Sequence, residues 1–272
     1  MDTKVIGGSR RIYESENFIR TYSLSPDSLA ENMKIYLLEL LQIFIRKEGG
    51  RRVVDFSRFA GDHCISTEWG EIELRGHLFD GGDSELLSFY IPERFFARDD
   101  AAVSTSDIVT SLYTLGRSTI NYHYWTEGSY IWGSCGFYQS SYHLEEGDRT
   151  FFLRFNGDIV RLALGAPEPR DCFYGDVAAG ILDPFARRLY QALCSKGEGY
   201  SFIVSKKKFF DLFNLARPSD GTFETEYVPS IVASLKRDAG LEVEFSSGRM
   251  RPPKMRELEC FCFKVIHDDN LI

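Results

Sequence analysis

The apolar and polar positions of this chain form a pattern that occurs twice. Residues 108–122 (IVTSLYTLGRSTINY) and 231–245 (IVASLKRDAGLEVEF) each run from an Ile-Val-x-Ser-Leu helical stretch past a glycine into an alternating strand. The similarity extends upstream, where residues 88–96 match residues 201–210 with one residue inserted. A repeat of this kind indicates two copies of one structural unit.

Each copy predicts the order short strand, short helix, second helix, strand, turn, strand, downstream of an amphipathic helix. The first amphipathic helix is predicted to begin at Ser25-Pro26, to run through Phe44 and to end at Gly49-Gly50, and the second to run from Asp183-Pro184 to Gly197. This order is that of the winged helix, whose second paired helix enters a groove of DNA. We therefore predict an α+β fold of two tandem winged-helix domains related by internal duplication.

Turn and linker signals divide the chain into four segments. Gly165-Ala166-Pro167-Glu168-Pro169 is the clearest linker signal, and residues 51–87 have no counterpart of similar length in the second copy. We expect Ser106 to cap the second paired helix of the first copy. The predicted segments are an N-terminal arm at 1–24, a winged-helix domain at 25–165 with an insertion of short strands and loops at 51–87, a linker at 166–180 and a second winged-helix domain at 181–272.

Composition narrows the class of protein. The chain has 272 residues, of which 43% are hydrophobic, enough for one or two sizeable cores. No apolar run approaches the length of a membrane span, and the first residues lack the apolar core of a secretory signal, so we expect a cytoplasmic protein. Among six cysteines the only close pair, Cys260 and Cys262, is too tight for a CxxC motif. We expect neither a metal nor a cofactor.

Charge is unevenly distributed along the chain. The whole sequence has a net charge of −8 and a pI near 5.3, which argues against a surface that is basic all over. Residues 181–266 nevertheless contain 14 Lys and Arg against 11 Asp and Glu, a net charge of +3, which leaves −11 for the rest. This asymmetry suggests that the two copies have different roles.

Three groups of polar and basic residues in the second copy fall where a winged helix contacts DNA. These places are the start of the first paired helix, the exposed side of the second paired helix, and the hairpin tip or wing. The candidate DNA-binding residues are Lys206, Lys207 and Lys208 in the first group, Tyr227, Ser230, Ser234, Lys236 and Arg237 in the second, and Arg249, Arg251, Lys254 and Arg256 in the third. The matching surface of the first copy, which includes Glu93 and Tyr113, is poorer in cations.

The sequence gives little support to an enzyme. Its five histidines form no HxxxH or HExxH spacing, no serine lies in GxSxG, and no GxxxxGK[ST] phosphate loop is present. Tyr122-His123-Tyr124 inverts the two-histidine pattern of relaxases that nick DNA with a tyrosine. We therefore predict a protein without catalytic residues.

Several stretches of the second copy carry a family resemblance. They are residues 181–193 (ILDPFARRLYQAL), 209–215, 234–243, and Gly248-Arg249 before Phe261-Cys262-Phe263. In this pattern residues 90–266 resemble the plasmid replication initiator (Rep) family with two tandem winged-helix domains. Two features depart from the family: its members are typically basic, whereas this chain is acidic, and residues 51–87 interrupt the first copy.

The resemblance implies a function in replication. It implies sequence-specific binding to repeated double-stranded sites at an origin, a monomer that initiates, a homodimer that represses its own gene, and recruitment of host replication proteins without catalysis. By the same analogy the first domain serves dimerisation and makes a secondary DNA contact, and the second holds the main recognition helix. The alternatives are an acidic winged-helix protein-interaction scaffold and a transcriptional regulator. A hydrolase or nuclease has no residue constellation behind it.

Overall fold

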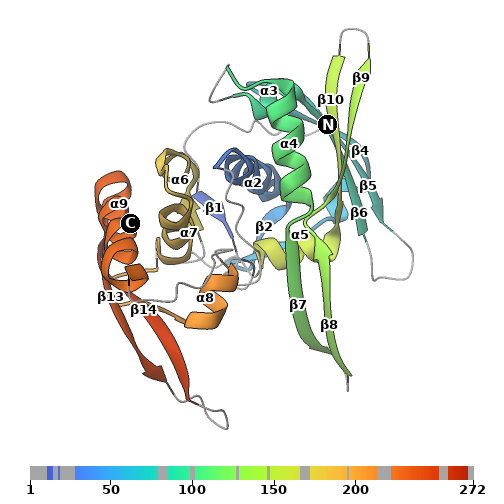
Figure 1. The fold of residues 1–272 in the computed structure, drawn as a ribbon. Coiled ribbons are helices and arrows are strands. Elements are labelled where there is room, and N and C mark those ends of the chain that lie inside the picture. Colours follow the sequence, from blue (N-terminus) through green and yellow to red (C-terminus); the bar gives the residue numbers. More distant parts are fainter. Residues whose placement is uncertain are drawn as a thin grey trace.

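The computed structural model combines helices with antiparallel sheets, so the predicted α+β class is confirmed (Figure 1). The structure describes residues 11–14, 18, 28–78, 85–98, 102–126, 129–145, 148–165, 172–194, 196–212, 222–250 and 257–268. Within these ranges no helix has both the length and the apolar character needed to cross a membrane.

The N-terminal unit, residues 28–165, is built on a five-stranded antiparallel sheet of order β4-β5-β6-β10-β9. Its elements are α2 (Ser28–Leu41), the 3-10 helix η1 (Gln42–Phe44), β2 (Ile45–Glu48), β3 (Arg51–Val54), the 3-10 helix η2 (Ser57–Phe59), β4 (Gly61–Thr67), β5 (Gly70–Leu78), β6 (Glu85–Pro92), α3 (Glu93–Phe96), α4 (Thr105–Gly116), β7 (Thr119–Thr126), β8 (Ser129–Gly136), β9 (Gln139–Glu145), β10 (Asp148–Asn156) and α5 (Gly157–Leu164). Figure 1 shows α2, α4 and α5 on one side of this sheet. Alternate strand residues such as Leu74, Phe89 and Leu153 are fully buried, as expected for a sheet with one covered face.

The C-terminal unit, residues 172–268, has a three-stranded antiparallel sheet of order β12-β14-β13. Its elements are β11 (Cys172–Tyr174), α6 (Gly175–Gly180), α7 (Pro184–Leu193), β12 (Ser201–Ser205), α8 (Lys206–Leu212), the π-helical turn η3 (Phe223–Tyr227), α9 (Val228–Ala239), β13 (Leu241–Met250) and β14 (Leu258–Asp268). The predicted Asp183 cap is confirmed, because its carboxylate accepts hydrogen bonds from the backbone N–H of Phe185 and Ala186 at 2.9 and 2.8 Å. Phe209, Phe223 and Phe261 form an aromatic core with ring centroids 5.1 to 5.7 Å apart.

One strand and helix order recurs in the two units. In the C-terminal unit β12, α8 and α9 precede β13 and β14, and β14 lies in the middle of the sheet. In the N-terminal unit β6, α3 and α4 precede β9 and β10, and β10 lies between β6 and β9. The helices α4 and α9 each have 12 residues and begin at matching positions of the repeated sequences.

The hairpin β7–β8 departs from the predicted repeat. The sequence match assigned β7 to the place of β13, but β7 pairs with β8 in a separate two-stranded ribbon, and β9 takes the equivalent place in the sheet. The ribbon ends at Gly136, where a Cβ atom would lie 2.4 Å from the carbonyl oxygen of Gly116. Buried Phe137 and Tyr138 then follow, so the chain can leave the ribbon and enter β9 only with glycine at this contact.

Two helix boundaries differ from those predicted. The first amphipathic helix ends at Leu41, and Gly49-Gly50, with φ of +56° and +83°, form the turn of the β2–β3 hairpin, which needs positive φ at both positions. Its predicted start at Ser25-Pro26 lies outside the described residues. Helix α4 is capped by Ser104 and not by Ser106, because the Ser104 hydroxyl accepts from the backbone N–H of Asp107 while the Asp107 carboxylate accepts from that of Ser104.

The two units meet at a buried polar cluster. The Nζ of Lys34 on α2 donates to the carboxylate of Glu14 at 2.9 Å and to the side-chain oxygen of Gln191 on α7 at 3.3 Å, and all three residues are buried. Burial, together with the charge of Arg188, lowers the pKa of Lys34. The predicted arm thus contributes Glu14 and the strand β1 (Arg11–Tyr13), which pairs with β11, and the predicted linker contains β11 and α6.

Candidate nucleic-acid interface

The start of α8 is fixed by Ser205 and by a half-buried lysine. The Ser205 hydroxyl accepts from the backbone N–H of Lys208 at 3.3 Å and so caps the helix. Lys206 forms an ion pair with Glu224, and its Nζ lies 5.2 Å from the centroid of the Phe261 ring. The side chains of Lys207 and Lys208 are exposed. Lys206 therefore makes contacts within the unit, whereas the side chains of the other two lysines face solvent.

Glu224 joins three elements at this end of the unit. Its second carboxylate oxygen accepts from the hydroxyl of Ser247 on β13 at 2.7 Å. The hydrogen bonds from Lys206 and Ser247 lower the pKa of Glu224. In the sheet register Ser205 lies opposite Cys260, which in turn lies opposite Gly248. The starts of α8 and η3 are thereby held beside the base of the wing.

The solvent face of α9 is small and polar, with two cations at its end. Ser230, Ala233, Lys236 and Arg237 are exposed, while Leu235 on the opposite side is buried. The helix ends at Gly240, whose φ of +62° is the left-handed conformation common at helix C-termini. At a rise of about 1.5 Å per residue, Arg237 lies roughly 10 Å along the helix axis from Ser230.

Two predicted members of this face do not lie on it. Ser234 is only 6% exposed, and its hydroxyl donates to the Asp238 carboxylate at 2.7 Å, because position 234 lies on the buried side of the helix with Ile231. Tyr227 precedes α9 and is half-buried, with its ring 5.5 Å from that of Phe185. Burial raises the pKa of Tyr227 to about 12. Both positions belong to packing within the unit.

The two cations at the end of α9 have acidic neighbours. The Nε of Arg237 donates to Oδ1 of Asp238 at 2.7 Å, and Nη2 donates to Oδ2 at 3.0 Å, although the Arg237 side chain is 72% exposed. The hydrogen bond from Arg237 lowers the pKa of Asp238. Lys236 donates to Glu242 at 2.9 Å. Because exposed ion pairs are weak, a phosphate can replace these carboxylates at little cost.

The wing is a longer hairpin than the sequence predicted. β13 extends to Met250, so Arg249, which was predicted to lie at the tip, continues the strand. Arg249 is exposed, and its Nη1 lies 4.0 Å from the Glu257 carboxylate. The candidates Arg251, Lys254 and Arg256 lie outside the described residues.

The equivalent face of α4 has a different character. Val109 and Tyr113 are 38% and 57% exposed. Arg117 donates from Nη1 to the Tyr113 hydroxyl at 2.5 Å and lies over its ring. Tyr113 and Thr114 stand where α9 has Lys236 and Arg237, so this face presents an aromatic ring and a hydroxyl in place of two cations.

Sequence reasoning missed the acidic partners of the candidate cations. Asp238 could have been found from its position next to Arg237, but Glu224 and Glu259 reach Lys206 only through the folding of η3 and β14. In the described part of the chain no three His, Cys, Asp or Glu side chains gather in a way that could hold a metal ion.

Comparison with known proteins finds likeness among solved structures. No family model and no curated protein matches the chain. Among solved structures, the chain is similar to the one titled "Crystal structure of Pi initiator protein in complex with iteron DNA", with a TM-score of 0.48 and 12% sequence identity over 96% of this chain and 97% of that chain.

Proposed function

We propose that this chain is a sequence-specific DNA-binding protein that acts without catalysis, and that its C-terminal unit is a winged helix holding the main contact. The observation that carries the proposal is the exposure of Lys207 and Lys208 on α8 and of Arg249 on β13, beside the row of register partners Ser205, Cys260 and Gly248, together with the polar solvent face of α9. In a winged helix these are the positions of the helix that crosses the backbone, the wing and the recognition helix. The small side chains of Ser230 and Ala233 leave room for base edges, and Arg237 suits a base or a phosphate.

The biological role that we propose is initiation of replication of a plasmid or mobile element by binding to repeated duplex sites at its origin. The support is the resemblance of residues 90–266 to plasmid initiators and the recurrence of one sheet order in both units, which fits tandem winged helices related by duplication. In this proposal the N-terminal unit forms the homodimer contact. Host replication proteins are further partners, and the protein acts in the cytoplasm.

The direct test is binding of the full chain to the duplex upstream of its own coding sequence. Fluorescence anisotropy would compare this duplex with a scrambled duplex of the same composition at two salt concentrations. We expect preference for the upstream duplex at both, with a steep loss of affinity as salt rises. Absence of binding to either duplex at low salt would contradict the proposal.

Two variants separate base contacts from backbone contacts. Arg237→Ala should weaken binding to the upstream duplex by about tenfold or more and leave the scrambled duplex nearly unchanged. Lys207→Ala should weaken both alike and reduce the salt slope by about one. Lys47→Ala, an exposed lysine of β2 in the N-terminal unit, is the matched control and should change neither. Equal loss of specificity from Arg237→Ala and Lys207→Ala would contradict these separate roles.

A second candidate is a winged-helix protein that binds other proteins, or a regulator that binds DNA but does not initiate. It is favoured by the acidic neighbours of Lys206, Lys236, Arg237 and Arg249. A regulator would bind the upstream duplex yet fail to support an origin plasmid when the chain is supplied in trans. A scaffold would bind neither duplex.

A further inference from the structure

The outer face of the five-stranded sheet has two aromatic rings at its centre. Tyr90 on β6 and Phe152 on β10 are register partners, so their side chains lie side by side on the same face. Their ring centroids are 5.1 Å apart, and each residue is partly exposed. Strands β6 and β10 are inner strands of the sheet, with β5 on one side and β9 on the other. The rings therefore form a platform in the middle of the face opposite the helices.

Two arginines extend this platform. The guanidinium carbon of Arg75 lies 4.6 Å from the Tyr90 ring centroid, and that of Arg154 lies 5.2 Å from the Phe152 ring centroid. Both arginines are exposed. Register places Arg75, Ser88 and Arg154 in one row across β5, β6 and β10. The platform is thus a pair of rings bordered by a row that carries two stacked cations.

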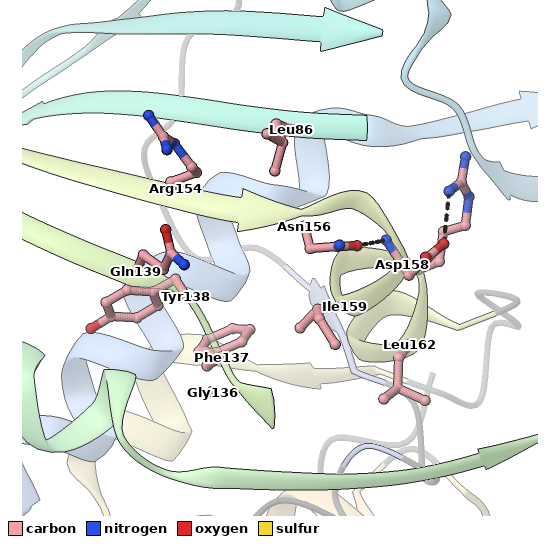
Figure 2. A pocket seen from close by; sticks show the side chains of 11 residues that line it. Leu86, Gly136, Phe137, Tyr138, Gln139, Arg154, Asn156, Asp158, Ile159 and Leu162 are labelled. Atoms are coloured by element: carbon pink, nitrogen blue, oxygen red, sulfur yellow. Dashed lines mark hydrogen bonds and ion pairs between the residues drawn. The ribbon is translucent and has the colours of Figure 1, made fainter. Parts of the chain in front are cut away.

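The platform continues into a cavity of about 650 Å³, which Figure 2 shows from close by. Arg154 and Gln139 line the cavity from the strands, and Phe137, Ile159 and Leu162 form its apolar part. Asn156 and Arg154 alternate with buried Phe155 along β10, so they share the outer face with Phe152. A cavity of this volume is large enough for a nucleotide.

The chemistry of this surface suits unpaired bases. Bases stack on aromatic rings and on arginine planes, and each stacked base contributes about 1–3 kcal/mol in proteins that bind single strands. A duplex cannot use the platform, because its bases are already stacked inside the helix. A protein partner would need a broader apolar patch, whereas the two rings are bordered by Glu73, Arg75, Ser88 and Arg154.

The charges on this face determine the path that a bound single strand of nucleic acid would follow. On β5, Glu73 lies opposite Tyr90 and pairs with Arg75 at 3.3 Å, and Glu71 is exposed on the same strand, so that edge repels phosphate. On β10, Arg154 lies between the Phe152 ring and the cavity. The favoured path therefore runs from the two rings across Arg154 into the cavity.

We propose that the outer sheet face of the N-terminal unit binds single-stranded nucleic acid. Two bases stack on Tyr90 and Phe152, Arg154 contacts the backbone, and a further base enters the cavity lined by Phe137 and Ile159. This site is separate from the duplex site proposed on α9 and does not depend on it.

The test uses the full chain and labelled 12-mers of oligo-dT and oligo-rU, measured by fluorescence anisotropy. The double variant Tyr90→Leu/Phe152→Leu keeps apolar bulk but removes the rings, and it should lower affinity at least tenfold. Tyr90→Phe should bind as the unaltered chain does, and Glu73→Gln should bind about twofold more tightly. Tyr113→Leu, an exposed tyrosine of the same unit, is the control. Tighter binding of oligo-dT would identify the ligand as DNA, and tighter binding of oligo-rU would identify it as RNA. Equal binding would show that the site does not discriminate between deoxyribose and ribose.

Two further readouts locate the site. Photocrosslinking with 5-iodouracil oligonucleotides should label peptides that contain Tyr90 or Phe152, and Arg237→Ala should leave single-strand binding unchanged. Circular dichroism checks that the leucine variants fold. Failure to bind either 12-mer, unchanged binding by the folded double variant, or crosslinks confined to residues 172–268 would each overturn the proposal, whatever the result with duplex DNA.

Discussion

The helices α4 and α9 occupy equivalent places in the two units, but only their buried sides have similar side chains. Their buried sides match: Leu112 and Leu235 are 1% and 0% exposed, and the adjacent Ser111 and Ser234 are also buried. Their solvent sides differ, with Tyr113 on α4 where α9 has Lys236. Packing restricts the residues that a core position accepts, whereas surface positions change at little cost in stability.

One scaffold thus carries two different surfaces in the two units. The C-terminal unit exposes lysines and Arg237 around α9, and the N-terminal unit exposes Val109 and Tyr113 on α4 and an aromatic pair on its sheet. The uneven charge of the sequence follows the same division. In our proposals the first surface binds duplex DNA, and the N-terminal unit provides the other contacts.

Substitution of the buried leucines tests whether α4 and α9 are packed alike, and it should have the largest effect of the changes considered. Leu112→Ala and Leu235→Ala should each lower the free energy of unfolding by about 2–5 kcal/mol, because each leaves a cavity in a packed core. Urea denaturation measures the loss, and Thr110→Ala, at an exposed position of α4, should change it by less than about 0.5 kcal/mol. A small loss from one leucine alone would show that the two helices are not packed alike.

Exchange of Tyr113 and Lys236 tests which helix contacts duplex DNA through its solvent side. Lys236→Tyr gives α9 the side chain of α4, and it should weaken duplex binding by about three- to tenfold through loss of a phosphate contact. Tyr113→Lys makes the reverse change on α4 and should leave duplex binding unchanged in the same anisotropy assay. Equal effects from the two exchanges would place both helices on the DNA.

A smaller effect concerns the pH dependence of the C-terminal unit. Hydrogen bonds lower the folded-state pKa of Glu224 below its ordinary value of 4.5. The carboxylate therefore contributes stability that is present above that value and is lost as pH falls through the lower, folded-state pKa. Glu224→Gln should cost about 0.5–1 kcal/mol at pH 7, and the cost should shrink on acidification. Urea denaturation at several pH values measures it, and a cost that stays constant down to pH about 2 would contradict the assignment.

The smallest expected effect concerns the partner of Arg237. Asp238→Asn keeps an acceptor for the Ser234 hydroxyl but removes the charge that holds the guanidinium. Duplex affinity should rise about twofold, because Arg237 then reaches DNA without leaving an ion pair. Asp158→Asn, an exposed acid on α5 that pairs with Arg161, is the matched control. A fall in affinity would mean that the Asp238 carboxylate orients Arg237 for binding.

Local signals in the sequence predicted much of the fold. The repeat located α4 and α9, and the cap and proline at Asp183-Pro184 located α7. The β7–β8 ribbon was not predictable from that signal, because its alternating residues suit a strand in either sheet and only the long-range pairing of β9 with β10 decides between them.

For the candidate site, the sequence indicated the positions of cations but not their surroundings. Lys207 and Arg237 are exposed as expected. Burial of Ser234 was missed because position 234 lies on the same buried side of α9 as Ile231. The pairing of Lys206 with Glu224 was missed because it joins elements that are distant in the sequence. Side-chain partners across such distances depend on the packed structure, which local periodicity does not encode.

The buried ammonium of Lys34 ties three distant parts of the chain into one cooperative structure. Its partners come from the N-terminal arm through Glu14 and from α7 through Gln191, while Lys34 itself lies on α2. The counter-charges of Lys34, Glu14 and Glu31, both belong to the N-terminal part of the chain, whereas Gln191 belongs to the C-terminal unit, so the set of contacts is complete only when both parts are present. A ribosome that has released only the first 165 residues has therefore made a unit whose hydrogen bond to Gln191 must wait for α7 to emerge.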